Sequence, residues 1–135
     1  MPEWGRIASI PHPPTIKKSK IHTQRNEGDY LMAIYYVAHR FGGDRENLER
    51  AKKITHDLQL EDPTNCYICP LLAFSHLKYG EMSYDEEMAL CLDLLSVSDV
   101  LVIASDISRG VQEELDFAKM VDMEVIDLAD KYREV

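Results

Sequence analysis

DVLVIA, at positions 99–104, is the clearest buried strand in the sequence. Its apolar residues follow one another without alternation, which is typical of a strand covered on both faces of a sheet. A second run of this kind, LMAIYYVA, occupies positions 31–38. Two fully covered strands in one chain favour a parallel sheet that lies between layers of helices.

Helical patterns begin after each of two turn regions. Asp44 is a candidate N-cap for a helix that we expect to end near residue 60. Ser83 and Glu86 form the pattern of a capping box, which predicts a second helix that ends near residue 97. In that second helix the inward positions are expected to be Met88, Ala89, Leu92, Leu95 and Ser96.

The remaining elements are shorter. The pattern predicts a strand over residues 66–72, an irregular loop over 74–82, a third helix over 111–121 and a last strand over 124–128. Strands that alternate with helices in this way are parallel neighbours joined by helical crossovers. We therefore predict an α/β fold, with a three-layer parallel sheet of four to five strands and helices on both faces.

This domain is predicted to comprise residues 30–135. Residues 1–29 hold four prolines and three lysines and show no apolar period. Proline removes a backbone donor and restricts its neighbour, so this composition predicts an extended N-terminal arm.

The net charge of −9 is unevenly distributed. Residues 1–29 carry five Lys/Arg and three acids, which leaves ten Lys/Arg and twenty-one acids for the rest of the chain. Such an acidic body repels a polyanion, so we expect no polymeric nucleic acid as a partner. A small nucleotide held by backbone N–H groups remains compatible with this charge.

Membrane and secretory signals are not found in the sequence. No apolar run reaches the roughly 18–20 residues of a bilayer span, and the first ten residues lack the pattern of a secretory signal. We therefore expect a cytoplasmic protein with no membrane partner.

Three cysteines, Cys66, Cys69 and Cys91, cannot all form pairs. Cys66 and Cys69 form a C-x-x-C motif, but the sequence has no second such motif and no histidine at zinc-finger spacing. We expect reduced thiols, and we interpret Cys66 and Cys69 as buried or half-buried cysteines of a strand. We expect no metal ion and no cofactor.

Ligands of open parallel sheets bind beyond the carboxyl ends of the strands. The turn after residues 99–104 contains Ser108 and Gly110 and leads into the third helix, whose first N–H groups could hold an anion with the help of Arg109. Glu114 follows one turn later, at a position nearer the cleft than that of a solvent-facing glutamate. In the alternative interpretation, the acidic residues near this turn only stabilise the N-terminus of the helix, by about 0.3–1 kcal/mol each.

Two motifs carry a resemblance to a known family. The first strand and its turn have the sequence YYVAHRFGG at 35–43, and the later turn and helix have the pattern S-x-G-x-x-x-E-L-x-F-A at 108–118. Together they resemble the nucleoside 2-deoxyribosyltransferase superfamily, which includes deoxynucleoside monophosphate N-glycosidases and related uncharacterised bacterial and phage domains. The resemblance spans residues 31–128. It implies a flavodoxin-like fold and a homodimer or higher homo-oligomer, because relatives complete their active sites across a subunit contact.

The resemblance implies roles for individual residues. Glu114, which precedes Leu-x-Phe-Ala, matches the nucleophile that attacks C1' of the sugar and displaces the base. Tyr35 matches the tyrosine whose hydroxyl orients that carboxylate. Ser108 matches the position that binds the 5'-phosphate in the monophosphate hydrolases. Gly42 and Gly43 match the glycines of the first loop that line the pocket.

The implied reaction is cleavage or transfer at the N-glycosidic bond of a 2'-deoxynucleoside 5'-monophosphate or a related nucleotide. Such cleavage passes through an oxocarbenium-like state, which a carboxylate beside C1' stabilises or traps as a covalent intermediate. Ser108, Arg109 and Gly110 would anchor the phosphate. The departing base needs an acid, for which Asp106 and His39 are the candidates, and His39 is also expected to bind substrate.

Two other functions fit the same pattern. A non-catalytic module that binds or senses a nucleotide would use the same anion cradle, and the bulky pair His39 and Arg40 in the first loop is compatible with it. A receiver-like signalling domain could hold Mg²⁺ with acids at strand ends. The first strand lacks an acidic pair at its end, which disfavours the receiver.

Overall fold

The computed structural model describes residues 32–133. Its sheet has four strands in the order β2-β1-β3-β4, and every neighbouring pair is parallel. The strands are β1 (Ile34–Ala38), β2 (Cys66–Ile68), β3 (Val100–Ile103) and β4 (Glu124–Asp127). The predicted arm, residues 1–29, lies outside the described residues.

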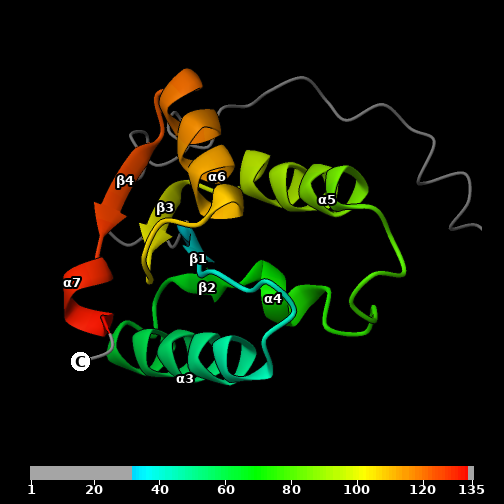
Figure 1. The fold of residues 1–135 in the computed structure, drawn as a ribbon. Helices are drawn as coiled ribbons and strands as arrows, with labels where there is room; N and C mark the ends of the chain where they lie inside the picture. Colours follow the sequence, from blue (N-terminus) through cyan, green and yellow to red (C-terminus); the bar gives the residue numbers. More distant parts are fainter. Residues whose placement is uncertain (1–31, 134–135) are drawn as a thin grey trace, which may run out of the picture. The chain divides into compact units, whose positions relative to one another are not determined.

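Helices cover both faces of this sheet (Figure 1). Helix α3 (Arg45–Glu61) lies on one face, and helices α5 (Tyr84–Ser96) and α6 (Arg109–Met120) lie on the other. Two short helices, α4 (Pro70–Ala73) and α7 (Ala129–Tyr132), follow β2 and β4. The three-layer α/β fold is confirmed; it is flavodoxin-like and has four strands.

Side chains of β1 alternate between the two layers, as the pleat of a strand requires. Tyr36 and Ala38 belong to the core under α5 and α6, where the fully buried Leu95 also lies. Val37 belongs to the opposite core, with Ala51 of α3. The position of a residue along β1 therefore decides which helices its side chain meets.

The predicted helix starts are confirmed by their capping contacts. The Asp44 side chain caps α3 by accepting a hydrogen bond from the backbone N–H of Glu46. At α5, Ser83 and Glu86 cap each other's backbone in a complete capping box. Both caps satisfy N–H groups that have no partner inside the helix.

Two local predictions were wrong. The second strand does not extend to residue 72 but ends at Ile68, because Pro70 occupies the first turn of α4, where a proline needs no N–H partner. In α5 the predicted inward residues Met88, Leu92 and Leu95 are half-buried or buried, but Ala89 and Ser96 are exposed, and Cys91 is half-buried instead. None of the helices within residues 32–133 is long and apolar enough to cross a membrane.

Candidate functional site

A cavity of about 220 Å³ opens where β1 and β3 end. The turn after β1, helix α5 and the start of α6 all contribute to its walls. Its lining includes the predicted site residues His39, Gly42, Ser108, Arg109, Gly110 and Glu114. Residues that are far apart in the sequence are therefore brought together as the parallel sheet predicts.

Glu114 lies at the base of this cavity and is only 4% exposed. Its Oε2 atom accepts a hydrogen bond from the Tyr36 hydroxyl, which comes from β1. Burial raises the pKa of the Glu114 carboxyl to about 7, although the Tyr36 hydrogen bond acts in the opposite direction. Burial and the nearby Glu114 carboxylate also raise the pKa of the Tyr36 phenol. The carboxyl and the phenol thus form a buried, coupled pair.

The tyrosine that contacts Glu114 is therefore Tyr36, and the prediction of Tyr35 for this place was wrong. Tyr35 points to the opposite face of β1, where its ring stacks on Tyr67 with the centroids 4.8 Å apart. The prediction was displaced by one residue along β1, and neighbouring residues of a strand point to opposite faces of the sheet. Tyr36 is the residue on the face that α6 covers.

The N-terminus of α6 forms one wall of the cavity. Ser108 is its N-cap and accepts a hydrogen bond from Val111 N–H at 3.3 Å. A serine hydroxyl has a hydrogen as well, so Ser108 can accept this bond and still donate one to a ligand. Because the first N–H groups of a helix have no partner inside it, this helix start suits an anion.

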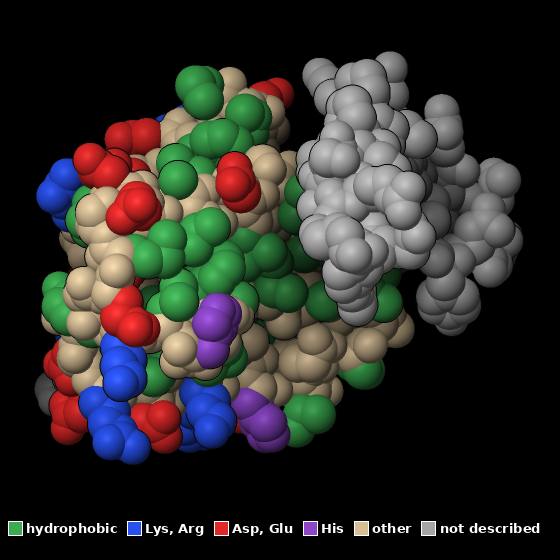
Figure 2. All heavy atoms as spheres, turned by 90° about the vertical axis from the view of Figure 1, so that its right-hand side faces the viewer, with side chains coloured by type: hydrophobic (Ala, Val, Ile, Leu, Met, Phe, Trp, Pro, Cys, Tyr) green, Lys and Arg blue, Asp and Glu red, His purple; other side chains and the backbone are tan. Residues whose placement is uncertain are grey.

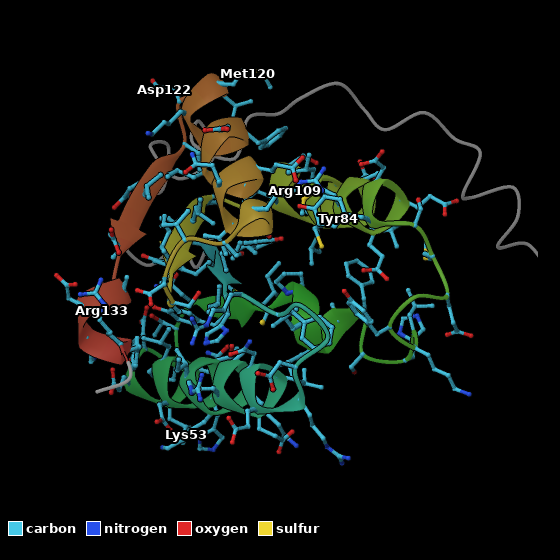
Figure 3. All side chains as sticks on the ribbon, viewed as in Figure 1. Lys53, Tyr84, Arg109, Met120, Asp122 and Arg133 are labelled. Atoms are coloured by element: carbon cyan, nitrogen blue, oxygen red, sulfur yellow. The ribbon has the colours of Figure 1, made fainter. Side chains whose placement is uncertain are left out.

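Arg109 borders the same wall and is engaged by two neighbouring side chains. Its guanidinium lies over the Tyr84 ring, 4.1 Å from the centroid (Figure 3). It is also 3.8 Å from the Glu113 carboxylate. Its side chain is 74% exposed. Arg109 therefore lines the cavity while its guanidinium also contacts Tyr84 and Glu113.

The two glycines of the first loop have different roles. Both have positive φ angles, 60° at Gly42 and 76° at Gly43, which glycine adopts without strain. Gly42 lines the cavity. Gly43 does not, and a Cβ atom there would lie 3.0 Å from the Tyr79 ring. The prediction that Gly43 lines the pocket was therefore wrong; its lack of a side chain makes room for Tyr79.

His39 lies in the wall and is 6% exposed. Its Nδ1 is 2.7 Å from the carbonyl oxygen of Arg40, and burial is the main cause that lowers the pKa of the ring. A neutral ring that donates through Nδ1 has an acceptor at Nε2. His39 is therefore better suited to bind a ligand donor than to supply a proton.

Asp106 does not line the cavity. Its carboxylate accepts a hydrogen bond from Arg133 Nε at 3.1 Å and is 3.8 Å from Arg40. These contacts place it beside a separate small hollow. The prediction of Asp106 as the acid for the departing base was therefore wrong, because the turn after β3 directs its side chain toward the end of α7.

The sequence interpretation missed the contribution of α5. Tyr84, Glu87, Met88 and Cys91 of this helix line the cavity. Their spacing of three and four residues places them on one helix face, and this is the signal that could have identified them. Burial raises the pKa of the Cys91 thiol to about 12, so it stays protonated. Among residues 32–133, no cluster of His, Cys, Asp or Glu side chains is arranged to hold a metal ion.

No protein-family model matches the chain, and no curated protein matches it. The fold is similar to that of a conserved protein from Enterococcus faecalis V583 with a crystal structure, at a TM-score of 0.61 and 20% sequence identity. The alignment covers 72% of this chain and 63% of that chain. The chain thus spans less than two thirds of the length of this neighbour, and at this identity the likeness shows the fold alone.

Proposed function

We propose that the protein cleaves or transfers the N-glycosidic bond of a 2'-deoxynucleoside 5'-monophosphate or a related nucleotide, with Glu114 as the nucleophile. The observation that carries this proposal is the buried carboxyl of Glu114 at the base of a cavity, bonded to the Tyr36 phenol. A buried ionisable group with a raised pKa in a cavity is typical of a functional site.

The Glu114 carboxylate suits the charge that develops in the reaction. Cleavage of the bond leaves positive charge on C1' and the ring oxygen, and a desolvated carboxylate interacts with such a charge more strongly than a hydrated one does. The Tyr36 hydroxyl holds one carboxylate oxygen, and the other would be available to the sugar. This is the role that the resemblance gave to Tyr35, and we assign it to Tyr36.

The N-terminus of α6 supports the choice of a phosphorylated substrate. Ser108, Arg109 and Gly110 line the same cavity as Glu114, and they precede it by four to six residues in one helix. A phosphate at this end would meet helix N–H groups and the positive end of the helix dipole. It would fix the sugar with C1' one helical turn deeper, next to the nucleophile.

Base release measures this function directly. We would incubate the protein with a panel of ribo- and deoxyribonucleoside monophosphates and separate the free bases by chromatography. The wild type should release base, and Glu114→Gln should release none. Asp116→Asn, an exposed acid on the same helix, serves as the matched control and should retain activity.

The alternative outcomes are informative. Undiminished release by Glu114→Gln would refute the nucleophile. Calorimetric binding of a nucleotide without any release, with an unchanged affinity in Glu114→Gln, would replace the enzyme with a nucleotide-binding module. The prediction of a homodimer or larger homo-oligomer belongs to the same proposal, and sedimentation of the purified protein measures it.

A further inference from the structure

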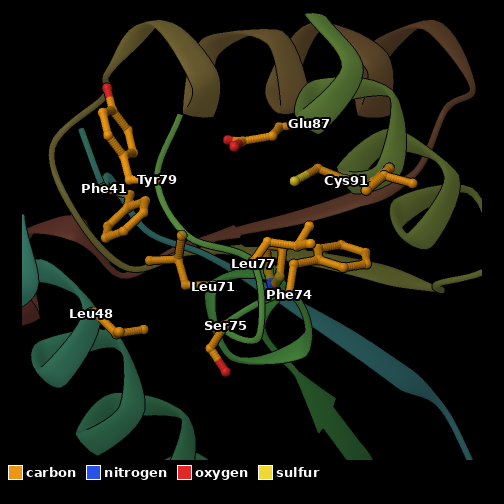
Figure 4. Close-up of a pocket in the computed structure, with 11 residues that line it drawn as sticks. Phe41, Leu48, Leu71, Phe74, Ser75, Leu77, Tyr79, Glu87 and Cys91 are labelled. Carbon is orange, nitrogen blue, oxygen red and sulfur yellow. The ribbon is translucent and has the colours of Figure 1, made fainter. Parts of the chain in front are cut away.

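Positive charge is scarce on this chain and unevenly placed. From residue 30 onward the sequence has ten Lys and Arg residues and twenty-one acids. Figure 2 shows hydrophobic side chains at the centre of one face and most of the visible Lys and Arg side chains together at its lower edge. The pocket in Figure 4 has Glu87 among its described lining residues but no Lys or Arg. A hollow lined by several cations is therefore unusual for this protein.

The small hollow beside Asp106 is such a place. Three arginines line it: Arg40 from the loop after β1, Arg50 from α3 and Arg133, which follows α7. His39 lines it as well. Burial, and to a lesser extent the charges of Arg50 and Arg40, lower the pKa of the His39 ring from 6.5, so the ring is neutral at pH 8. The described lining thus has three positive charges and one negative charge, that of Asp106.

Arg40 is fixed through its backbone more firmly than through its guanidinium. Its N–H donates to the Ser105 hydroxyl at 2.9 Å, and its carbonyl oxygen lies 2.7 Å from His39 Nδ1. The Arg40 Nη1 atom is 3.8 Å from the Asp106 carboxylate, which is beyond hydrogen-bond distance. Its Nε atom is buried and has no hydrogen-bond partner among the described residues. A buried donor without an acceptor is costly, so this N–H favours an acceptor that binds from outside.

The other two arginines have exposed acids as neighbours. Arg50 lies 3.8 Å from Glu46, and Arg133 lies 2.9 Å from Asp130 and 3.1 Å from Asp106. The Glu46 and Asp130 side chains are 83% and 91% exposed, and such ion pairs contribute little to stability. A guanidinium has five N–H donors, so each of these arginines can bind a ligand in addition to its present partners.

The charge and shape of the hollow favour a phosphate group. A carboxylate has two oxygens in one plane, whereas phosphate has a tetrahedral set of oxygens that arginines from three different segments can share. At pH 8 inorganic phosphate is mainly a dianion, which matches the excess of positive charge. The hollow has a volume of about 10 Å³, which is room for about one oxygen atom, so the rest of the phosphate would lie at its mouth.

We propose that this hollow is a second anion site, which binds inorganic phosphate or the phosphoryl group of a small metabolite between Arg40, Arg50 and Arg133. One phosphate oxygen accepts a hydrogen bond from Arg40 Nε, and the others meet the guanidinium groups of Arg50 and Arg133. The residues of the anion site at the start of α6 do not line this hollow. His39 lines both the hollow and the large cavity, so the two sites are neighbours. The inference does not depend on the proposed reaction.

Binding of inorganic phosphate to the full chain tests this inference. Calorimetry at pH 8, with chloride used to keep the ionic strength constant, measures the affinity. The wild type should bind phosphate saturably, and Arg40→Gln should bind it about tenfold more weakly, as the loss of a charge-assisted hydrogen bond predicts. Arg133→Gln changes an exposed side chain and should also weaken binding. Arg45→Gln, an exposed arginine at the start of α3, is the matched control and should bind as the wild type does.

A second ligand distinguishes the two sources of the phosphate group. Ribose 5-phosphate that binds more tightly than inorganic phosphate, with the same dependence on Arg40, would identify a phosphorylated metabolite, and weaker or equal binding would identify the free ion.

Three results would overturn the site. They are no saturable binding by the wild type, an unchanged affinity in Arg40→Gln, and an equal loss in Arg45→Gln. If Arg40→Gln does not fold, as judged by circular dichroism, the affinity of Arg133→Gln decides in the same way. A loss in Arg109→Gln without one in Arg40→Gln would place the phosphate at α6 instead and would equally overturn the inference.

Discussion

Replacing Glu114 with glutamine should stabilise the folded protein at pH 8 and change its stability much less at pH 5. Burial raises the pKa of this carboxyl from 4.5 to about 7 in the folded protein. Between these values the unfolded chain loses the proton and the folded one keeps it, so the folded state loses stability as the pH rises. Above pH 7 both states are ionised and the loss is complete.

The size of the effect follows from the shift. One pKa unit corresponds to about 1.4 kcal/mol, so ionised Glu114 lowers the free energy of unfolding by about 3 kcal/mol at pH 8. At pH 5 the same carboxyl lowers the free energy of unfolding by less than about 1 kcal/mol. Glutamine has nearly the same shape, its carbonyl oxygen can still accept from the Tyr36 hydroxyl, and it does not ionise. The variant should therefore gain about 3 kcal/mol over the wild type at pH 8.

Urea unfolding at pH 5, 6, 7 and 8, followed by far-ultraviolet circular dichroism, measures this difference. The stability of Glu114→Gln minus that of the wild type should rise with pH and level off above 7. Asp116→Asn is the control for loss of a negative charge on α6, and its difference should show no comparable rise. A Glu114→Gln difference that stays flat with pH, or a less stable variant at pH 8, would show that Glu114 is not a buried acid of raised pKa.

Three further predictions concern the rest of the site. Tyr36→Phe should lower the free energy of unfolding by about 1.5–3 kcal/mol at pH 8, because it leaves a buried carboxylate without its hydrogen-bond donor. Tyr35→Phe should lower it by less than about 1 kcal/mol, and urea unfolding compares the two variants. Base release should fall in the first variant only. Asp106→Asn breaks an exposed ion pair with Arg133, so the free energy of unfolding measured with urea should fall by no more than about 1 kcal/mol. Base release by this variant should be unchanged. Gly110→Ala should fold, because the close contact of its Cβ, at 3.2 Å, would be with the flexible end of Met88, and the Tyr84 hydroxyl would lie at an ordinary 3.6 Å. Calorimetry should show the affinity for a deoxynucleotide reduced about fivefold, or about 1 kcal/mol, by the narrower cavity.

The layers of the fold were predictable because their signals are local. The runs at positions 31–38 and 99–104 contain the two central strands, and the caps at Asp44 and Ser83 mark the starts of two helices. Such signals depend on residues within one or two turns of each other. The short helices α4 and α7 were not predicted, because four residues are too few to show an apolar period.

The contacts within the site depend on information that is not local. Tyr35 and Tyr36 are neighbours in one strand, and each would be buried in a sheet with helices on both sides. Which of them meets Glu114 depends on which face α6 covers, and that is a property of the crossover rather than of either tyrosine. The same holds for Asp106, whose partners Arg40 and Arg133 belong to segments far from it in the sequence.

The stability that the folded protein loses when Glu114 is ionised is itself an argument for a functional role of this residue. Domains of this kind are stable by about 5–15 kcal/mol, and a carboxylate that removes about 3 kcal/mol at neutral or higher pH is a large fraction of that margin. Glutamine would fill the same space and keep the contact with Tyr36 at lower cost. A position that served packing alone would have no use for the charge. In a cleft beside a helix N-terminus that suits an anion, the same charge would stabilise the cationic sugar of the proposed reaction, and this is why we explain the site by chemistry rather than by the fold.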